Sequence, residues 1–351
     1  MPADSPDLFG DPPPDPQGRG APGPAARLPE DVALGAALPG SIRLGTSSWS
    51  FPGWAGIVYD RPASESLLAR KGLAAYAHHP LLRTVGIDRA FYKPMSAAQF
   101  AELAAQVPPG FRFLVKAPAM VCDAVRRDDT GRGLSPNPGF LDAELAVSEF
   151  VKPALAGLGD ACGPLVFQLS PLPRALLADG ARTIERLHSF LTEVLRLCGG
   201  VSKPPHLAVE VRDRELLTRD FAAALKDAGA RYCLGVHARM PSAEEQLPLL
   251  RALWPGSLTV RWNLHAGLRY EEARADYAPF NRLVDEDPDT RATLARVALA
   301  TARAGHEVTI IANNKAEGSA PLTLKRLAQA IVAADGVAQK PAGAAPPRAT
   351  S

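Results

Sequence analysis

Residues 82–106, LRTVGIDRAFYKPMSAAQFAELAAQ, contain the unit that decides the fold. The unit starts with Leu82–Ile87, a short run rich in β-branched residues, which predicts a strand. Ser96 then precedes an Ala-rich segment and Pro108 follows it, and these residue types commonly begin and end a helix. A strand followed by a helix is the repeating element of parallel sheets. This stretch therefore predicts one β–α unit.

The same order recurs along the chain. The predicted strands are Ile42–Thr46, Leu82–Ile87, Phe111–Val115, Leu165–Leu169, Leu207–Val211, Tyr232–Val236, Leu258–Trp262 and Val308–Ala312, and a helical pattern follows each of them. Eight such units fit an α/β protein with a (β/α)8 barrel of the TIM type. The competing doubly wound sheet normally has a GxGxxG turn after its first strand, and GTSSWS at residues 45–50 does not match that pattern.

The bulk composition excludes several classes of protein. The 351 residues include 39 basic and 37 acidic side chains, and this net charge of +2 gives no electrostatic reason to expect nucleic acid or a membrane surface as a partner. No apolar run reaches the ~20 residues of a membrane-spanning helix, and the amino terminus lacks the features of a signal peptide. We therefore expect a cytoplasmic protein, in which four scattered cysteines remain reduced.

Both ends of the chain are rich in proline. Residues 1–40 hold ten prolines and residues 336–351 form a Pro/Ala tail, so both are predicted to be disordered and 41–335 to form a single barrel domain. Within the leader, Asp7, Leu8 and Phe9 resemble the DLF ending of short peptides that bacterial replication clamps capture. Matches of this length are frequent by chance.

Polar residues follow every predicted strand. In TIM barrels the carboxyl ends of the strands carry the chemistry, so we expect a ligand site there. The residues expected to bind a ligand are Trp49, Trp54, Tyr59, Tyr92, Lys116, Gln168, Arg212, Arg261, Asn313 and Asn314. The cationic members suit a phosphate or carboxylate, the aromatic rings suit a flat molecule, and the Asn pair leads into a helix whose N–H groups suit an anion.

Glu210 and His265 are the candidates for acid–base chemistry. Glu210 alternates with apolar residues and is predicted to point inward, and histidine titrates near neutral pH. A structural ion pair is an equally good explanation for Glu210, and a small satellite core is an equally good explanation for the aromatic residues. A metal site formed by His237, His265 and Glu210 is a weaker alternative because no regular ligand spacing supports it. No cofactor is predicted.

The order of the motifs resembles one family. IRLGTSSWSFPGWAGIVYD, at residues 42–60, is similar to the opening IGTSGWSYxxWxGxFYP of the YecE-like family (domain of unknown function 72). Later segments agree in order: Phe91–Tyr92, PPGFRFLVKAP at 108–118, GPLVFQLSP at 163–171, Val209–Arg212, Arg261 with His265, and ANNKAEGSA at 312–320. The resemblance covers about residues 42–330. It implies a TIM barrel and no established activity.

The chain also departs from the family pattern. Where the family has VEINxTFY, this sequence has Gly86 for the Glu, Asp88 for the Asn and Ala90 for the Thr. The family's KxPxxxTH ends here in Cys122 and Asp123. The resemblance therefore implies a divergent member, with an altered substrate or with binding alone.

Three functions follow as hypotheses. The first is a barrel that binds or processes a small polar anionic molecule at its C-terminal rim. The second is a non-catalytic interaction or scaffold protein that uses the short motif in its leader, and the third is a metal-dependent hydrolase or isomerase. Whether the protein is an enzyme at all stays open at this stage.

Overall fold

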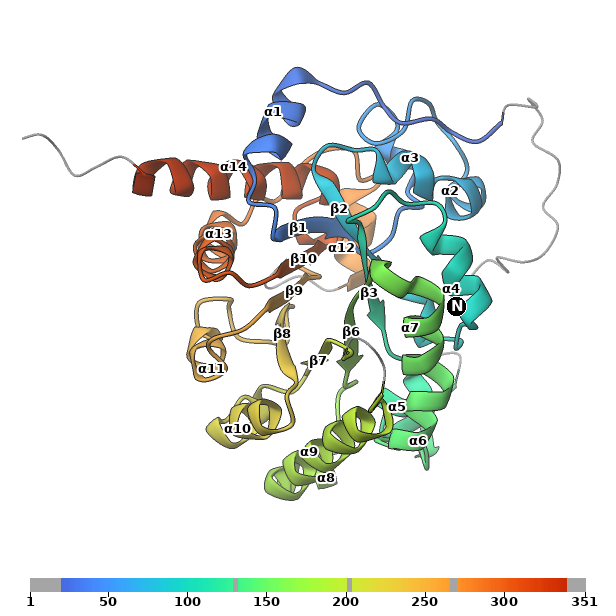
Figure 1. The fold of residues 1–351 in the computed structure, drawn as a ribbon, viewed down its shortest axis with the longest axis vertical. Helices are drawn as coiled ribbons and strands as arrows, with labels where there is room; N and C mark the ends of the chain where they lie inside the picture. Colours follow the sequence, from blue (N-terminus) through green and yellow to red (C-terminus); the bar gives the residue numbers. More distant parts are fainter. Residues whose placement is uncertain (1–19, 129–131, 201–203, 266–269, 340–351) are drawn as a thin grey trace, which may run out of the picture.

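The computed structural model describes residues 20–128, 132–200, 204–265 and 270–339. Its centre is a closed barrel of eight parallel strands in the order β1–β10–β9–β8–β7–β6–β3–β2 (Figure 1). The strands are β1 (Ile42–Thr46), β2 (Leu82–Ile87), β3 (Arg112–Lys116), β6 (Cys162–Gln168), β7 (Leu207–Glu210), β8 (Arg231–Val236), β9 (Leu258–Trp262) and β10 (Val308–Ala312). The predicted (β/α)8 barrel is confirmed.

Helices surround the barrel on its outside (Figure 1). They are α2 (Glu65–Lys71), α3 (Leu73–Ala77), α4 (Ala97–Ala104), α7 (Lys152–Leu158), α9 (Gly180–Leu197), α10 (Arg219–Asp227), α11 (Leu247–Ala252), α13 (Pro288–Arg303) and α14 (Ala320–Gln339). The predicted start of α4 is confirmed by a capping box, in which Gln99 N–H donates to Ser96 Oγ and Ser96 N–H donates to Gln99 Oε1.

Several short elements were not predicted. They are α1 (Pro29–Ala37), α5 (Ala119–Cys122), the antiparallel pair β4 (Val125–Arg127) and β5 (Gly133–Pro136), α8 (Arg174–Ala178) and α12 (Tyr270–Tyr277). Most of them lie in the connections that follow β3 and β6, on the side of the barrel where strands end. The helical segment predicted at about Leu141–Leu155 is present as α6 (Ala143–Ala146), a π-helical turn (Val147–Val151) and the start of α7.

The boundaries of the predicted leader and tail need correction. Helix α1 lies within the predicted leader, yet Lys325 of α14 pairs with Asp31 at 2.7 Å and with Glu30 at 3.4 Å. Pro24 also forms a bridge with Tyr59. Residues 20–40 therefore belong to the fold, and α14 continues past residue 335 to Gln339. The Asp7–Phe9 motif lies outside the described residues.

The inner face of the barrel has layers of different character. Its middle is a buried apolar cluster of Leu114, Val166, Ala208, Cys233 and Ile311, each from a different strand. Side chains alternate along a strand, so residues two positions further on face the same interior. Those positions hold Lys116, Gln168, Glu210, Gly235 and Asn313. The C-terminal layer of the barrel is therefore polar and charged, and an apolar floor closes it below.

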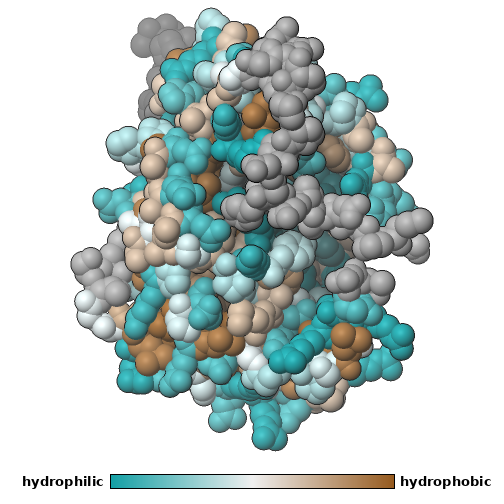
Figure 2. Space-filling model, turned by 90° about the vertical axis from the view of Figure 1, so that its right-hand side faces the viewer, coloured by the Kyte–Doolittle hydropathy of each residue, from teal (hydrophilic) through white to brown (hydrophobic). Residues whose placement is uncertain are grey.

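The visible outer surface is mixed in character. Figure 2 shows small hydrophobic patches separated by hydrophilic residues on the face that it presents. Large exposed apolar residues such as Leu134 and Trp254 lie on separate elements. Among the helices in the described ranges, none has both the length and the apolar character that crossing a bilayer requires.

Candidate functional site

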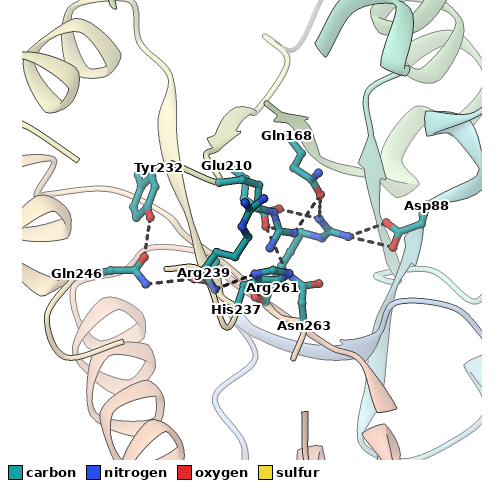
Figure 3. Close-up of polar contacts among 11 residues, drawn as sticks. Asp88, Gln168, Glu210, Tyr232, His237, Arg239, Gln246, Arg261 and Asn263 are labelled. Atoms are coloured by element: carbon teal, nitrogen blue, oxygen red, sulfur yellow. Dashed lines mark hydrogen bonds and ion pairs between the residues drawn. The ribbon is translucent and has the colours of Figure 1, made fainter. Parts of the chain in front are cut away.

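One guanidinium organises the C-terminal end of the barrel. Arg261, on β9, is 3% exposed, and its Nη1 donates to Glu210 Oε2 at 2.7 Å and to Gln168 Oε1 at 2.8 Å. Its Nη2 lies 3.0 and 2.9 Å from the two carboxylate oxygens of Asp88, which directly follows β2. Figure 3 shows these contacts converging on Arg261. This side chain thus connects four strands of the barrel.

Glu210 lies between two arginines. Its Oε1 forms an ion pair with Arg212 Nη2 at 2.7 Å and accepts a hydrogen bond from Asn263 Nδ2 at 3.3 Å, while Arg261 occupies Oε2. Gly235 leaves room for the carboxylate, since a Cβ there would lie 3.0 Å from Oε1. Burial raises the pKa of Glu210, but the charges of Arg212 and Arg261 outweigh burial and hold it below its ordinary value. The ionised carboxylate is poorly suited to the acid–base role predicted for it.

Lys116 occupies the end of β3 in a different environment. Its Nζ lies 3.5 Å from the ring centroid of Phe91, and the side chain is half-buried. Within the described parts of the chain, this Nζ has neither a hydrogen-bond acceptor nor an ion-pair partner. Burial, and after it the charge of Arg261, lowers the pKa of Lys116 to about 8. This amine therefore gives up its proton more easily than an ordinary lysine.

The side chains around Arg261 form a cluster that carries a net positive charge. It also contains hydrogen-bond donors that have no acceptor within the cluster. Lys116, Arg212 and Arg261 carry three positive charges, and Asp88 and Glu210 carry two negative charges. Among the described residues, Arg212 Nη1 and Arg261 Nε are buried donors that have no partner. Buried donors are rarely left unpaired, and each of these two groups can still donate a hydrogen bond.

His237 follows β8 and lies at the same rim (Figure 3). Its Nδ1 accepts the backbone N–H of Arg239 at 3.2 Å, while burial and then the charge of Arg212 lower its pKa to about 4. The ring is therefore neutral at pH 7, and the proton resides on Nε2. No three His, Cys, Asp or Glu side chains within the described ranges converge as metal ligands, so the alternative site of His237, His265 and Glu210 gains no support.

Three of the predicted ligand-stacking residues lie in the core. Trp54 and Tyr59 are fully buried, and Trp49 is 5% exposed. Trp49 Nε1 donates to the carbonyl oxygen of Leu68 at 3.0 Å, and the Tyr59 hydroxyl donates to the carbonyl oxygen of Trp49. The rings therefore pack the loop after β1 against the barrel, as a satellite core does. Tyr92 is the opposite case, with 82% of its surface exposed.

Asn313 and His265 hold loops at the rim. Asn313 Nδ2 donates to Ser47 Oγ at 2.8 Å, and its Oδ1 accepts the backbone N–H of Lys315 at 3.0 Å. The backbone N–H of His265 donates to the carbonyl oxygen of Lys315 at 3.0 Å, and its Nε2 lies 3.6 Å from Asp285 Oδ2. These contacts join the loops after β9 and β10. They do not bring His265 into the hydrogen bonds around Arg261.

Replacing Asn314 with alanine is expected to destabilise the fold. Its Oδ1 accepts Trp54 Nε1–H at 3.3 Å and the backbone N–H of Ala320 at 2.8 Å, and the side chain is 1% exposed. The substitution leaves two buried donors unpaired, so urea titration should show a loss of about 2 kcal/mol. Exposed Asn281 is the matched control, whose alanine variant should unfold like the wild type. A loss for Asn314→Ala equal to that of the control would contradict this structural role.

A basic cavity lies at the opposite end of the barrel. It has a volume of about 1080 Å³ and is lined in part by Arg43 and Arg112 at the starts of β1 and β3, by Lys152, and by Asp160 and Glu307. Arg43 already pairs with Glu307. The N-terminal face of a TIM barrel generally serves stability. This cavity is nevertheless the natural competitor for any anion that the protein binds.

Comparison with known proteins now gives the family. The profile of a family described as "Protein of unknown function DUF72" matches residues 43–348. This chain belongs to the DUF72 family. The resemblance to the YecE-like family is thereby confirmed, and the DUF72 description states no activity. No curated protein matches the chain.

Solved structures of DUF72 proteins share the fold. Two crystal structures of a DUF72 protein from Enterococcus faecalis V583 match with TM-scores of 0.55 and 0.50, at 18% and 16% identity. The matches cover 83% and 82% of this chain and 95% and 96% of those chains. A DUF72 protein from Thermotoga maritima MSB8 matches at 16% identity and a TM-score of 0.49, covering 84% of this chain and 99% of that chain. At identities this low, the two Enterococcus matches establish a common fold only.

The departures from the DUF72 pattern have structural counterparts. At Gly86, a Cβ would lie 3.1 Å from the carbonyl oxygen of Ser47, so the close approach of β1 and β2 favours glycine here. Asp88 forms a two-pronged ion pair with Arg261, which an amide at that position could not form. Ala90 is 1% exposed in the core, and Asp123 accepts Arg127 Nε at 2.8 Å. The rim of this member is thus held by its own set of charges.

Most residues of the cluster were predicted from the sequence as site residues, and two further residues that contact them were not. Lys116, Gln168, Glu210, Arg212 and Arg261 converge. Asp88 and Phe91 belong to the segment that follows the second predicted strand, which was expected at the rim, but neither was named as a candidate site residue. No sequence pattern indicated that Asp88 pairs with Arg261 or that Phe91 lies against Lys116.

Proposed function

We propose that this DUF72 protein binds a small molecule through one anionic group at the C-terminal end of the barrel. The observation that carries the proposal is Arg212 Nη1, which has no hydrogen-bond partner among the described residues, in a cluster that also contains the Lys116 ammonium, which has no hydrogen-bond acceptor or ion-pair partner among them. A carboxylate or phosphate oxygen would accept from the buried donor and balance the excess charge. Hydrogen bonds between ionised partners are about twice as strong as neutral ones.

The carboxylates of the cluster are already committed to other partners. Asp88 and Glu210 are held by Arg261 and Arg212 at 2.7–3.0 Å, so neither is positioned to neutralise Lys116. A buried charge without a partner lowers the stability of a protein. Such a cost is common at functional sites, where the ligand supplies the missing partner.

Neutral His237 supplies a donor of a different kind at the same rim. Its Nε2–H can donate to an uncharged oxygen of the ligand, because Nδ1 is occupied by the backbone of Arg239. One anion-binding part and one neutral donor favour a polar organic anion, such as a small hydroxy or oxo acid or a phosphate ester. The proposed ligand belongs to this class.

The test is binding of inorganic phosphate and pyruvate, measured by titration calorimetry and by the shift in melting temperature. Arg212→Met should weaken binding by about 10–100-fold, since it removes one or two hydrogen bonds to a charged group. Arg112→Met, in the cavity at the opposite end, is the matched control and should bind as the wild type does. If Arg112→Met abolished binding and Arg212→Met did not, the proposal would be wrong.

A further inference from the structure

We propose that Lys116 is a nucleophile that forms a Schiff base with the carbonyl carbon of an aldehyde or ketone carrying that anionic group. This inference rests on the proposed function for the binding of the ligand, and it adds the reacting atom and the substrate class. The observation that carries it is the position of the Lys116 amine. It lies over the Phe91 ring, has no hydrogen-bond acceptor among the described residues, and shares the inner layer of the barrel with the ion pairs around Arg261.

Lys116 differs from the other described lysines. Lys71 and Lys226 lie in solvent, and Lys325 pairs with two carboxylates of α1. Only Lys116, of the lysines in the described ranges, combines a place in the inner C-terminal layer with the absence of any acceptor for its Nζ. An amine used only for structure would be expected to have an acceptor.

The surroundings of Lys116 favour the neutral amine, which is the nucleophilic form. The Phe91 ring covers one side of Nζ as a cation–π partner, which favours the ammonium, but burial together with the charges of Arg261 and Arg212 outweighs this contact and disfavours the charged form. Lysines are made nucleophilic in this way, by desolvation or by a neighbouring cation. A pKa of about 8 leaves a useful fraction of the amine unprotonated near neutral pH.

The chemistry needs no oxidant and no further reactant. The lone pair of Nζ attacks the carbonyl carbon, and the carbonyl π electrons move to its oxygen. Proton transfer from nitrogen to oxygen gives a carbinolamine. Its hydroxyl group takes up one further proton and leaves as water when the C–O bond breaks and the nitrogen lone pair forms the C=N bond. The resulting iminium cation lies where Asp88 and Glu210 already stabilise positive charge. Arg212 Nη1 would hold the anionic group of the same molecule.

The experiment is reductive trapping on the full-length protein. The chain is incubated with pyruvate or with dihydroxyacetone phosphate, treated with sodium borohydride and mapped by peptide mass spectrometry. We expect a reduced adduct on Lys116 that forms at least about tenfold faster than on exposed Lys71 and Lys226, and that increases as the pH rises through 8. Lactate, which carries a carboxylate but no aldehyde or ketone carbonyl, should slow trapping without forming an adduct.

The outcomes separate this inference from the function on which it rests. One outcome is phosphate binding that depends on Arg212, together with no more label on Lys116 than on Lys71 or Lys226 for either probe. This result would show that Lys116 is not a nucleophile, and it would still support the anion site. Absence of both phosphate binding and labelling would overturn both. Lys116→Arg, which keeps the positive charge but has no nucleophilic amine, should lose the adduct. The peptide map of the wild type decides the question even if that variant does not fold.

Discussion

Replacing Arg261 with methionine is expected to lower the free energy of unfolding by about 3–5 kcal/mol. The variant leaves partly exposed Asp88 without its bidentate partner and fully buried Glu210 with only one of its two arginines. Removing one partner of a buried ion pair is much more costly than removing an exposed pair. Urea titration followed by circular dichroism measures the loss.

Arg196→Met is the matched control for Arg261→Met. Arg196 pairs with Glu193 at 2.5 Å on the exposed face of α9, and its loss should leave the midpoint of unfolding unchanged. If both variants lost the same small amount of stability, the cluster around Arg261 would not be the organising element described above. Arg261→Lys should fall between the two, because an ammonium cannot reproduce the planar fork.

Replacing Lys116 with methionine is expected to make the protein more stable. An amine whose pKa falls from 10.5 to about 8 on folding costs the folded state about 3 kcal/mol at neutral pH. Methionine removes that cost and retains apolar contact with Phe91, so we expect a gain of about 2–3 kcal/mol at pH 7. A stabilising substitution at a polar site indicates that the wild-type residue serves function.

The sign of the pH dependence follows from the same values. The unfolded chain keeps the Lys116 proton up to about pH 10.5, and the folded chain keeps it only up to about pH 8. Unfolding therefore takes up a proton between these values, so wild-type stability relative to Lys116→Met rises with pH above 8. Lys226→Met, on an exposed face, should show no such convergence. A constant difference between wild type and Lys116→Met at all pH values would contradict the account.

The barrel could be predicted because its strands are apolar runs with clear interruptions. β1, β2, β9 and β10 have the predicted bounds, since a strand buried on both faces has a simple signature. α1 was missed because proline dominates the composition around it. Pro29, Glu30 and Asp31 are nevertheless ordinary residues for the first turn of a helix.

The site could be predicted in part. The alternation of residues along strands places Lys116, Gln168 and Glu210 in one layer, and that placement follows from the sequence. The pairing of Arg261 with Asp88 joins residues far apart in the chain and depends on how the barrel closes. The sequence could not decide whether Trp54 is buried or lines a pocket, because loop residues have no regular periodicity that indicates which side chains point into the core.

The most direct test of the central claim is a crystal of this protein soaked in selenate, with the anion located by its anomalous scattering. The account predicts a selenate at the C-terminal end of the barrel, with oxygens within about 3.2 Å of Lys116 Nζ and Arg212 Nη1. Selenate bound only in the cavity lined by Arg43 and Arg112, with the C-terminal rim empty at the same concentration, would contradict it.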